Sequence, residues 1–373
     1  MNVPKLRFKE FNDEWCYQSL SKYVNRITTK NKNNESDLVL TISAQYGLVD
    51  QTIFFNRSVS SSNLTGYYLL NNGDFAYNKS YSNGYPWGAV KRLNKYNQGV
   101  VSSLYICFKT NNLIDSNFLE QYFETNKWYQ QISEVSVEGA RNHGLLNIAV
   151  NNFFNTKHYI PSIKEQEKIS KFLSLLDKKM ELQTKKIEDL KLFKLSKYSL
   201  FFSNSNNKIK LSDICIIEKG KQINSDLLIE KGNYYMLNGG ILPSGYLNEY
   251  NTNENTITIS EGGNSCGYVN FNKTKFWCGG HCYKIISSSV NSSYLYHLLK
   301  HNEKIIMDLR VGSGLPNIQK KDLEALKLSI HKNDEQLKIG ILFDTFDKKI
   351  NLETNKLNKF KELKKALMQV MFV

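Results

Sequence analysis

The sequence predicts a mixed α/β protein in which two globular domains are separated by two long helices, and the helices pair as an antiparallel coiled coil. The segment EQEKISKFLSLLDKKMELQTKK, which begins at Glu165, returns as EQLKIGILFDTFDKKINLETNK at Glu335, 170 residues later and without a gap. Both copies carry apolar residues at helical coiled-coil spacing. We therefore expect an internal pseudo-twofold repeat with domains at 1–159 and 204–332 and helices at 160–203 and 333–373.

Length and composition favour two ordinary domains with cores of their own, because the chain has 373 residues and 41% of them are apolar. Forty-nine Lys and Arg residues against 35 Asp and Glu residues leave a net charge of +14. Such a charge is compatible with a polyanionic partner. No apolar run of about 18 residues is present, so we expect a soluble, cytoplasmic protein with no membrane contact. The six irregularly spaced cysteines predict reduced thiols rather than a disulfide framework.

The repeat extends beyond the two quoted segments. Between 165–202 and 335–372, 13 of 38 aligned residues are identical. The same offset aligns GLLNI at Gly144 with GLPNI at Gly314, and Ile160 with Ile330. Further upstream the similarity decays. The repeated unit therefore includes the end of the domain that precedes each helix, whereas the rest of each domain has diverged.

A seam of mostly apolar residues runs along each predicted helix in steps of four and three. The seam residues are Ile169, Leu173, Leu176, Met180, Ile187 and Leu190 in the first helix and Ile339, Phe343, Phe346, Ile350, Leu357 and Phe360 in the second. Polar residues interrupt both seams at the same place, Gln183 and Glu353. An intermolecular coiled coil or a core stripe would show the same spacing, but two helices in one register within one chain favour pairing with each other.

The globular parts combine β-like runs with helical segments. LVLTIS at 38–43, VVSSLYICF at 100–108, NTITIS at 255–260 and CYKIIS at 282–287 are predicted strands, separated by glycine-containing turns. The segments 116–132 and 292–309 have helical spacing. Two mixed α/β domains are the result.

Two motifs, one at the end of each predicted domain, resemble those of a known protein family. YIPSIKEQEKISKFLSLLDKKME at 159–181 and GLPNIQKKDLEALKLSIHKNDEQ at 314–336 resemble the end of a target-recognition domain and the long helix after it in specificity subunits of type I restriction-modification systems. The resemblance covers the whole chain in architecture. A proline-rich approach to the helix, frequent in that family, is reduced here to Pro161 in the first copy and is missing from the second.

The resemblance implies a non-catalytic subunit that recognises double-stranded DNA. Each domain would recognise one half of a split, asymmetric target, while the helices set the spacing and dock two methyltransferase subunits. Restriction subunits would complete the nuclease. No cofactor is expected in this chain, whereas the partner subunits would use S-adenosylmethionine, ATP and magnesium. The alternatives are a coiled-coil scaffold that binds proteins, or a stand-alone nuclease.

The sequence contains no recognised catalytic motif, which agrees with a subunit that borrows its chemistry. It has no Gly-x-x-x-x-Gly-Lys phosphate loop, no Asn-Pro-Pro-aromatic run and no convincing adenosylmethionine loop. Cys266, Cys278, His281 and Cys282 could be considered as zinc ligands, but no Cys-x-x-Cys pair is present, so we expect no metal. Acid–base pairs such as Glu218 with Lys219 are interpreted as ordinary surface.

Candidate DNA-binding residues lie on glycine-rich or polar loops that offer cations and amides, because cations hold phosphates and amides distinguish base edges. A plain turn is the alternative for each loop. The candidates in the first domain are Lys79, Tyr81, Asn83, Tyr85, Trp87, Lys91 and Arg92, followed by Arg141, Asn142 and His143 just ahead of GLLNI. Those in the second are Glu261 and Asn264, with Arg310 and Ser313 just ahead of GLPNI.

Overall fold

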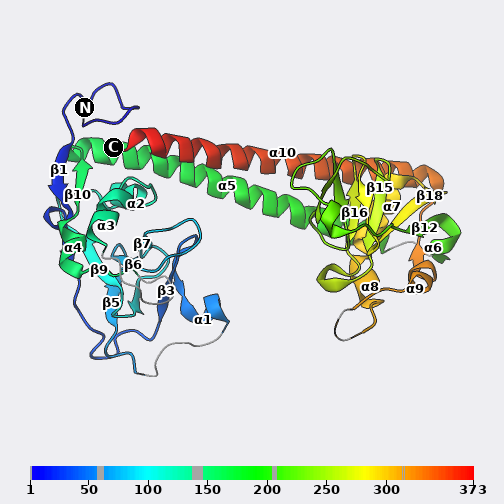
Figure 1. Ribbon diagram of the computed structural model, residues 1–373, viewed down its shortest axis with the longest axis horizontal. Coiled ribbons are helices and arrows are strands. Elements are labelled where there is room, and N and C mark those ends of the chain that lie inside the picture. The colour runs from blue at the N-terminus through cyan, green and yellow to red at the C-terminus, as the bar shows by residue number, and fades with distance from the viewer. Residues whose placement is uncertain (1, 57–62, 137–145, 204–207, 313, 315) are drawn as a thin grey trace. The chain divides into compact units, whose positions relative to one another are not determined.

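The computed structural model describes residues 2–56, 63–136, 146–203, 208–312, 314 and 316–373 (Figure 1). The chain divides into two compact units, Met1–Leu182 with Leu357–Val373, and Gln183–Lys356. Each unit contains one globular part and a portion of both long helices, α5 (Ile163–Phe202) and α10 (Asn333–Met371). The predicted mixed α/β architecture with two long helices is confirmed.

The first unit is built from short strands and helices that precede α5. Its strands are β1 (Cys16–Ser19), β2 (Val24–Arg26), β3 (Leu40–Ser43), β4 (Gly47–Asp50), β5 (Tyr68–Asn71), β6 (Phe75–Asn78), β7 (Ala89–Arg92), β8 (Gln98–Val101), β9 (Ile106–Thr110) and β10 (Lys157–Ile160). Its helices before α5 are η1 (Leu20–Lys22), α1 (Gln51–Phe55), α2 (Ser116–Phe123), α3 (Tyr129–Val135) and α4 (Val150–Asn155).

The second unit has its globular part between the two long helices. Its strands are β11 (Lys208–Lys210), β12 (Cys215–Lys219), β13 (Tyr234–Leu237), β14 (Gly245–Leu247), β15 (Thr256–Ser260), β16 (Val269–Asn272), β17 (Trp277–Cys278), β18 (Cys282–Ser288) and β19 (Lys327–Ser329). Its shorter helices are α6 (Leu211–Ile214), η2 (Ser225–Leu227), η3 (Gly263–Ser265), α7 (Ser292–His301), α8 (Glu303–Asp308) and α9 (Lys320–Glu324).

Both units contain the same four-stranded antiparallel sheet, although their sequences have diverged. The strand order is β2-β9-β6-β7 in the first and β12-β18-β15-β16 in the second. In each unit a helix follows the second strand of that order, and a separate antiparallel strand pair, β1-β10 or β11-β19, joins the start of the domain to the segment before the long helix. The duplication visible in the helices therefore extends to the topology of the domains.

Three predicted elements are each split in the structure. The run 100–108 forms the end of β8 and the start of β9, because Tyr105 N–H donates to Ser102 O in a tight turn between them. The helical segment 116–132 divides into α2 and α3, since the Thr125 hydroxyl donates to Tyr122 O and ends α2. The segment 292–309 likewise divides into α7 and α8, where the Asn302 amide donates to Leu298 O.

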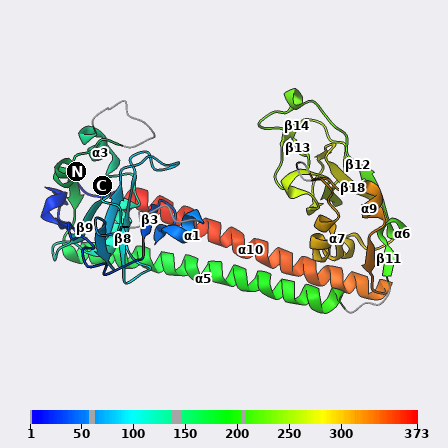
Figure 2. The same cartoon turned by 90° about the horizontal axis from the view of Figure 1, so that it is seen from below.

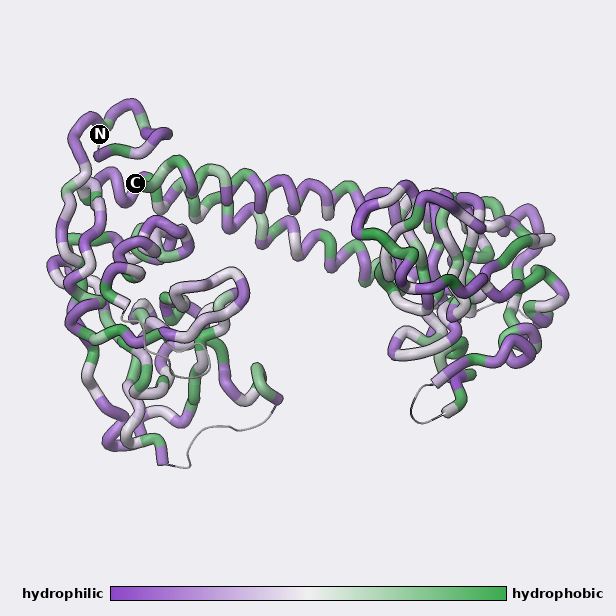
Figure 3. The backbone as a smooth tube through the Cα atoms, viewed as in Figure 1, coloured by the Kyte–Doolittle hydropathy of each residue, from purple (hydrophilic) through white to green (hydrophobic). Residues whose placement is uncertain are grey.

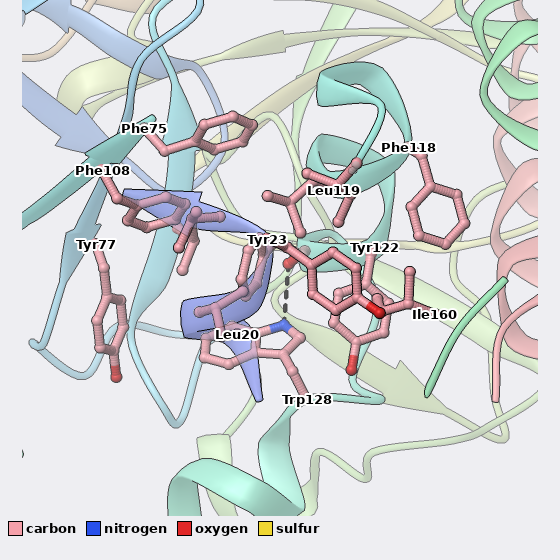
Figure 4. Close-up of a cluster of buried hydrophobic side chains, with 14 of the residues drawn as sticks. Leu20, Tyr23, Phe75, Tyr77, Phe108, Phe118, Leu119, Tyr122, Trp128 and Ile160 are labelled. Carbon is pink, nitrogen blue, oxygen red and sulfur yellow. Dashed lines mark hydrogen bonds between the residues drawn. The ribbon is translucent and has the colours of Figure 1, made fainter. Parts of the chain in front are cut away.

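Aromatic side chains fill the core of the first unit. Phe75 and Phe108 stack with ring centroids 5.2 Å apart (Figure 4). The Trp128 indole N–H donates to Phe123 O at 3.1 Å, so its burial leaves no unpaired donor. Ile169 and Leu173 of α5 and Met368 of α10 belong to the same cluster. The long helices are thus part of this domain's core as well as a connection.

The core of the second unit is closed by the opposite ends of the same two helices. Tyr198 and Phe202 of α5 pack on Phe343 of α10, and the Tyr198 and Phe343 ring centroids are 4.4 Å apart. The Tyr198 hydroxyl also contacts His297 Nδ1 of α7 at 2.8 Å. These contacts hold α7 against both long helices, so the ends of α5 and α10 are part of the core of the second domain.

The helices run antiparallel within each unit, as predicted. In the first unit, Asp177 contacts Lys364, and Lys179 lies over the Phe360 ring. In the second unit, Gln183 contacts Glu353, and Lys194 contacts Asp347. Every predicted seam residue is buried or partly buried. Hydrophobic and hydrophilic residues alternate along both helices (Figure 3). The polar interruptions of the two seams meet, since Gln183 Nε2 donates to Glu353 Oε2 at 2.6 Å.

The start of each long helix is anchored by the same buried glutamine. Gln166 Nε2 donates to Pro161 O at 2.9 Å, and Gln336 Nε2, one repeat later, donates to His331 O at 3.0 Å. In the first unit the neighbouring Glu165 also binds Arg7 with both carboxylate oxygens at 2.8 Å. The N-terminal segment lies beside the end of α10, where Leu6 N–H donates to Val370 O (Figure 2).

Candidate nucleic-acid interface

The loop between β6 and β7 carries half of the DNA-binding candidates of the first domain. Tyr81 and Asn83 are exposed at its tip, and 60% of the Tyr81 surface is accessible. Tyr85 is partly buried. Trp87 packs against the main core, and its carbonyl accepts from the Tyr77 hydroxyl at 2.7 Å. The tip therefore offers one aromatic ring and one amide to a ligand, while Trp87 anchors the loop.

The cationic candidates of this loop and of β7 have partners within the domain. Lys91 Nζ lies 2.5 Å from Glu124 Oε1, and Arg92 Nη2 lies 2.6 Å from Glu120 Oε2. Lys79 Nζ donates to Ile148 O at 3.3 Å. Burial raises the pKa of Glu120, and the nearby Arg92 charge opposes that shift. These cations hold α2 and the GLLNI segment against the sheet.

The turn between β3 and β4 brings two further polar residues to the same surface. Gln45 and Tyr46 sit in SAQYG, where Gly47 adopts a φ of +81° that favours glycine. Tyr46 is 63% exposed. The two residues and the tip of the β6–β7 loop line one hollow of about 330 Å³. The sequence signal for this turn is weak, because it consists only of an amide, an aromatic residue and a glycine in SAQYG, and neither Gln45 nor Tyr46 was predicted to bind DNA.

A larger groove lies on the other side of the β3–β4 turn. It is bounded by that turn, by the end of β7 and α2, and by facing turns of α5 and α10, all within the first unit. Its volume is about 1040 Å³. Gln45 and Tyr46 line both hollows, so this turn forms the ridge between them.

In the second domain the structure brings Glu261, Asn264 and Arg310 to one region. Ile318 N–H of the GLPNI motif donates to Glu261 O at 2.8 Å, and Asn317 bridges both Gly262 and Val311. Asn264 and Arg310 are exposed. The GLPNI motif thus holds the candidate loop of the second domain in place. In the first domain, Leu146 of the GLLNI motif makes an equivalent contact, because its N–H donates to Lys79 O at 2.7 Å.

The Glu261 side chain organises its surroundings. Its Oε1 accepts from Lys219 Nζ at 2.7 Å, and Oε2 lies 3.7 Å from His281 Nδ1. Tyr283 contacts the same carboxylate and donates to Ile318 O at 2.9 Å. Burial is the main cause that raises the pKa of Tyr283 to about 12, so this phenol stays protonated at neutral pH. Lys219 therefore belongs to a polar surface cluster.

Four candidates lie outside the described residues. These are Arg141, Asn142 and His143, ahead of the first repeated motif, and Ser313, ahead of the second. Their predicted roles stay predictions.

The cysteines of the second domain are mostly buried structural thiols. Cys278 and Cys282 interact with each other, and this contact raises the pKa of Cys278 and lowers that of Cys282. Cys282 Sγ also accepts from Gly239 N–H at 3.1 Å. Cys266 donates to Glu261 O at 3.0 Å. Across the described part of the chain, no group of three or more His, Cys, Asp and Glu side chains is placed to hold a metal ion.

One part of the chain, the second globular part with most of α10, matches a known family. Residues 204–362 match the family described as the type I restriction modification DNA specificity domain. The second globular part is therefore similar to a type I DNA specificity domain. The family resemblance seen in the sequence is thereby confirmed, and the matched specificity domain includes the second globular part together with most of α10.

Proteins similar to parts of this chain are found in mycoplasmas. The chain is 35% identical over 153 residues to a protein of Mycoplasma pneumoniae named as a type I specificity subunit, and 31% identical over 138 residues to a similarly named protein of Mycoplasma genitalium. The matched stretches cover 40% of this chain and 40% of the first relative, and 36% of each chain for the second.

Solved type I structures share the fold. The S subunit of a type I restriction-modification system from Mycoplasma genitalium matches 100% of this chain and 99% of its own length, with a TM-score of 0.63 at 19% identity. A chain from a structural study of type I complex assembly matches 97% of this chain and 98% of its own, with a TM-score of 0.59 at 16% identity. Among the described residues, no helix is long and apolar enough to span a membrane.

Proposed function

We propose that this chain is the DNA-specificity subunit of a type I restriction-modification complex. The globular domains 1–159 and 204–332 act as target-recognition domains, and each recognises one half of a bipartite DNA target. The observation that carries the proposal is the duplicated topology: the same four-stranded sheet and the same buried glutamine anchor occur once per unit. Two related domains on one helical repeat suit two half-sites better than one continuous site.

The helices 160–203 and 333–373 serve as a spacer and as a dock for two methyltransferase subunits. Lys178 and Lys179 of α5 and their repeat equivalents Lys348 and Lys349 of α10 are exposed. Because each helix repeats the same outer face, two identical partners can bind in equivalent ways. Restriction subunits join through this core. S-adenosylmethionine, ATP and magnesium belong to those partners, so this subunit supplies recognition and positioning without catalysis.

Base contacts are assigned to the exposed tips. In the first domain these are Tyr81 and Asn83 together with Gln45 and Tyr46; in the second they are the loops that carry Glu261, Asn264 and Arg310. Amide and carboxylate side chains distinguish bases through hydrogen bonds to their edges. Phosphate contacts fix orientation but carry no sequence information.

Methylation mapping tests the proposal directly. The chain is co-expressed with a type I modification subunit, and modified adenines are located genome-wide. We expect a split motif with two specific halves. In the double variant Gln45→Ala with Tyr46→Ala, one half of that motif should relax while the other is retained, because the second domain is untouched. Loss of both halves in a folded variant, or a continuous motif in the parent protein, would contradict two-domain recognition.

A further inference from the structure

The larger groove of the first unit is lined by charged residues from β7, α2, α5 and α10 and from the turns next to β7 and α2. Lys91, Arg92 and Lys95 come from β7 and the turn after it, whereas Lys361, Lys364 and Lys365 come from the last turns of α10. Glu120, Glu124 and Asp177 also line it. The lining therefore has six cations against three carboxylates, and a net charge of +3.

Each carboxylate in the groove already has a cation. Glu124 is paired with Lys91 at 2.5 Å, Glu120 with Arg92 at 2.6 Å, and Asp177 with Lys364 at 2.6 Å. These pairs neutralise the negative charge and join β7 to α2 and α5 to α10. The acidic residues therefore do not oppose an anionic ligand.

Lys95, Lys361 and Lys365 are the surplus cations of the groove. All three are exposed, and none forms an ion pair with any residue in the ranges that the structure describes. Lys361 and Lys365 lie one helical turn apart, about 6 Å along the axis at about 1.5 Å per residue. That spacing is close to the rise of two nucleotides along the duplex axis, at about 3.4 Å per phosphate of one strand.

We infer that this groove holds the phosphate backbone of one DNA strand, with Lys361 and Lys365 of the C-terminal helix as phosphate ligands. The inference rests on the proposed function and extends it, because α10 then contacts DNA as well as spacing the domains. The ridge formed by Gln45 and Tyr46 borders the groove, so a strand held there places its neighbouring bases beside this turn. Backbone positioning and base recognition by the first domain would share one site.

Removal of the two helix lysines tests the inference in the full-length chain. Binding of a fluorescein-labelled duplex of arbitrary sequence is measured over a range of KCl concentrations for the parent and for Lys361→Ala with Lys365→Ala. Each lost phosphate contact reduces the slope of log affinity against log salt by about 0.9. We expect the double variant to bind more weakly and its slope to fall by about 2. Lys95→Ala, on the opposite wall, should reduce the slope by about 1.

The matched control is Lys338→Ala with Lys359→Ala, which removes the same charge from exposed α10 positions that do not line the groove. Its slope should stay close to that of the parent. Thermal unfolding should be unchanged in all variants, since the lysines are exposed. Equal slopes for the groove variant and the control would overturn the inference and leave the proposed function standing. No duplex binding by the parent chain at low salt would overturn both.

A fluorescent ADP analogue separates a DNA groove from a nucleotide pocket. The inference predicts no saturable binding of this probe at concentrations where the duplex binds. If the parent binds the probe, the groove variant loses that binding, and duplex affinity is unchanged in the variant, then the groove is a nucleotide pocket and the inference is wrong.

Discussion

Lys364 of α10 donates to both carboxylate oxygens of Asp177 of α5, at 2.6 and 2.8 Å. One repeat away, the helices exchange roles: Lys194 of α5 lies 2.5 Å from Asp347 of α10. Asp177 and Asp347 are 170 residues apart, as are Lys194 and Lys364. Each unit thus contains one copy of the same interhelical ion pair, and the pairs set the register of the helices in both units.

A double-mutant cycle should detect the Asp177–Lys364 pair. Asp177→Asn and Lys364→Met are made singly and together. The stability of the first unit in urea is measured for each variant by hydrogen exchange. Lys364 is only 15% exposed, so we expect a coupling of about 1 kcal/mol, at the upper end for such pairs. The surface pair Lys178–Glu181, with exposures of 62% and 70%, provides the control and should couple by less than about 0.5 kcal/mol. Equal coupling free energies in both cycles would show that the interhelical pair stabilises the protein no more than an exposed surface pair does.

Replacement of Gln166 should destabilise the first unit. Its side chain is 1% exposed, accepts from Asp115 N–H at 2.8 Å and donates to Pro161 O at 2.9 Å. Gln166→Leu keeps the size but leaves two buried backbone groups without partners, each at a cost of about 1–3 kcal/mol. Hydrogen exchange should show a lower free energy of opening for the first unit, with the second unit unaffected. Gln336→Leu is the reciprocal control, and a loss of protection in the same unit for both variants would refute the anchoring role.

His158 should make the first unit sensitive to acid. The Thr156 hydroxyl donates to Phe153 O, so His158 Nε2–H donates to Thr156 Oγ1 and Nδ1 accepts from the Tyr122 hydroxyl, both at 2.8 Å. The imidazole is therefore neutral, and burial lowers its pKa to about 3.

The unfolded chain takes up a proton near the ordinary histidine pKa of about 6.5, whereas the folded protein does not until about pH 3. The stabilisation by neutral His158 is present above pH 6.5 and is lost as the pH falls towards 3. Between pH 6.5 and 5 the loss amounts to about 2 kcal/mol. Urea titrations at pH 7 and pH 5 should show this extra loss for the parent but not for His158→Gln. The same pH dependence in both proteins would assign the effect to other groups.

Lengthening both helices together should lengthen the gap between the two half-sites. Four helix-forming residues are inserted after Gln183 in α5 and four after Glu353 in α10, which adds about 6 Å to each helix at about 1.5 Å per residue. At about 3.4 Å per base pair, the nonspecific gap should grow by about two base pairs with both half-sites retained. Methylation mapping measures the gap, and an unchanged gap would refute the spacer role.

The same insertion in α5 alone is the control. It would shift α5 against α10 and separate Lys194 from Asp347 and Tyr198 from Phe343. We therefore expect this variant to lose stability in the second unit rather than to gain two base pairs of spacing.

The long helices and the duplication were predictable from residue order. Helical periodicity and repeat offset depend on neighbours within one or two turns, and these are visible along the chain. The polar interruptions at Gln183 and Glu353 could also be located, although only the folded pair reveals that they hydrogen-bond to each other.

The candidate interface depended on contacts between distant segments. Lys91 and Arg92 look available in the sequence, yet α2 supplies them with carboxylates from residues 25 or more positions away. Lys361 and Lys365 look like an ordinary solvated helix face, yet the fold places them opposite β7 and the β3–β4 turn. Whether a cation is paired or left for a ligand depends on which charges the fold brings within a few ångströms of it, because electrostatic interaction follows distance in space and not separation along the chain.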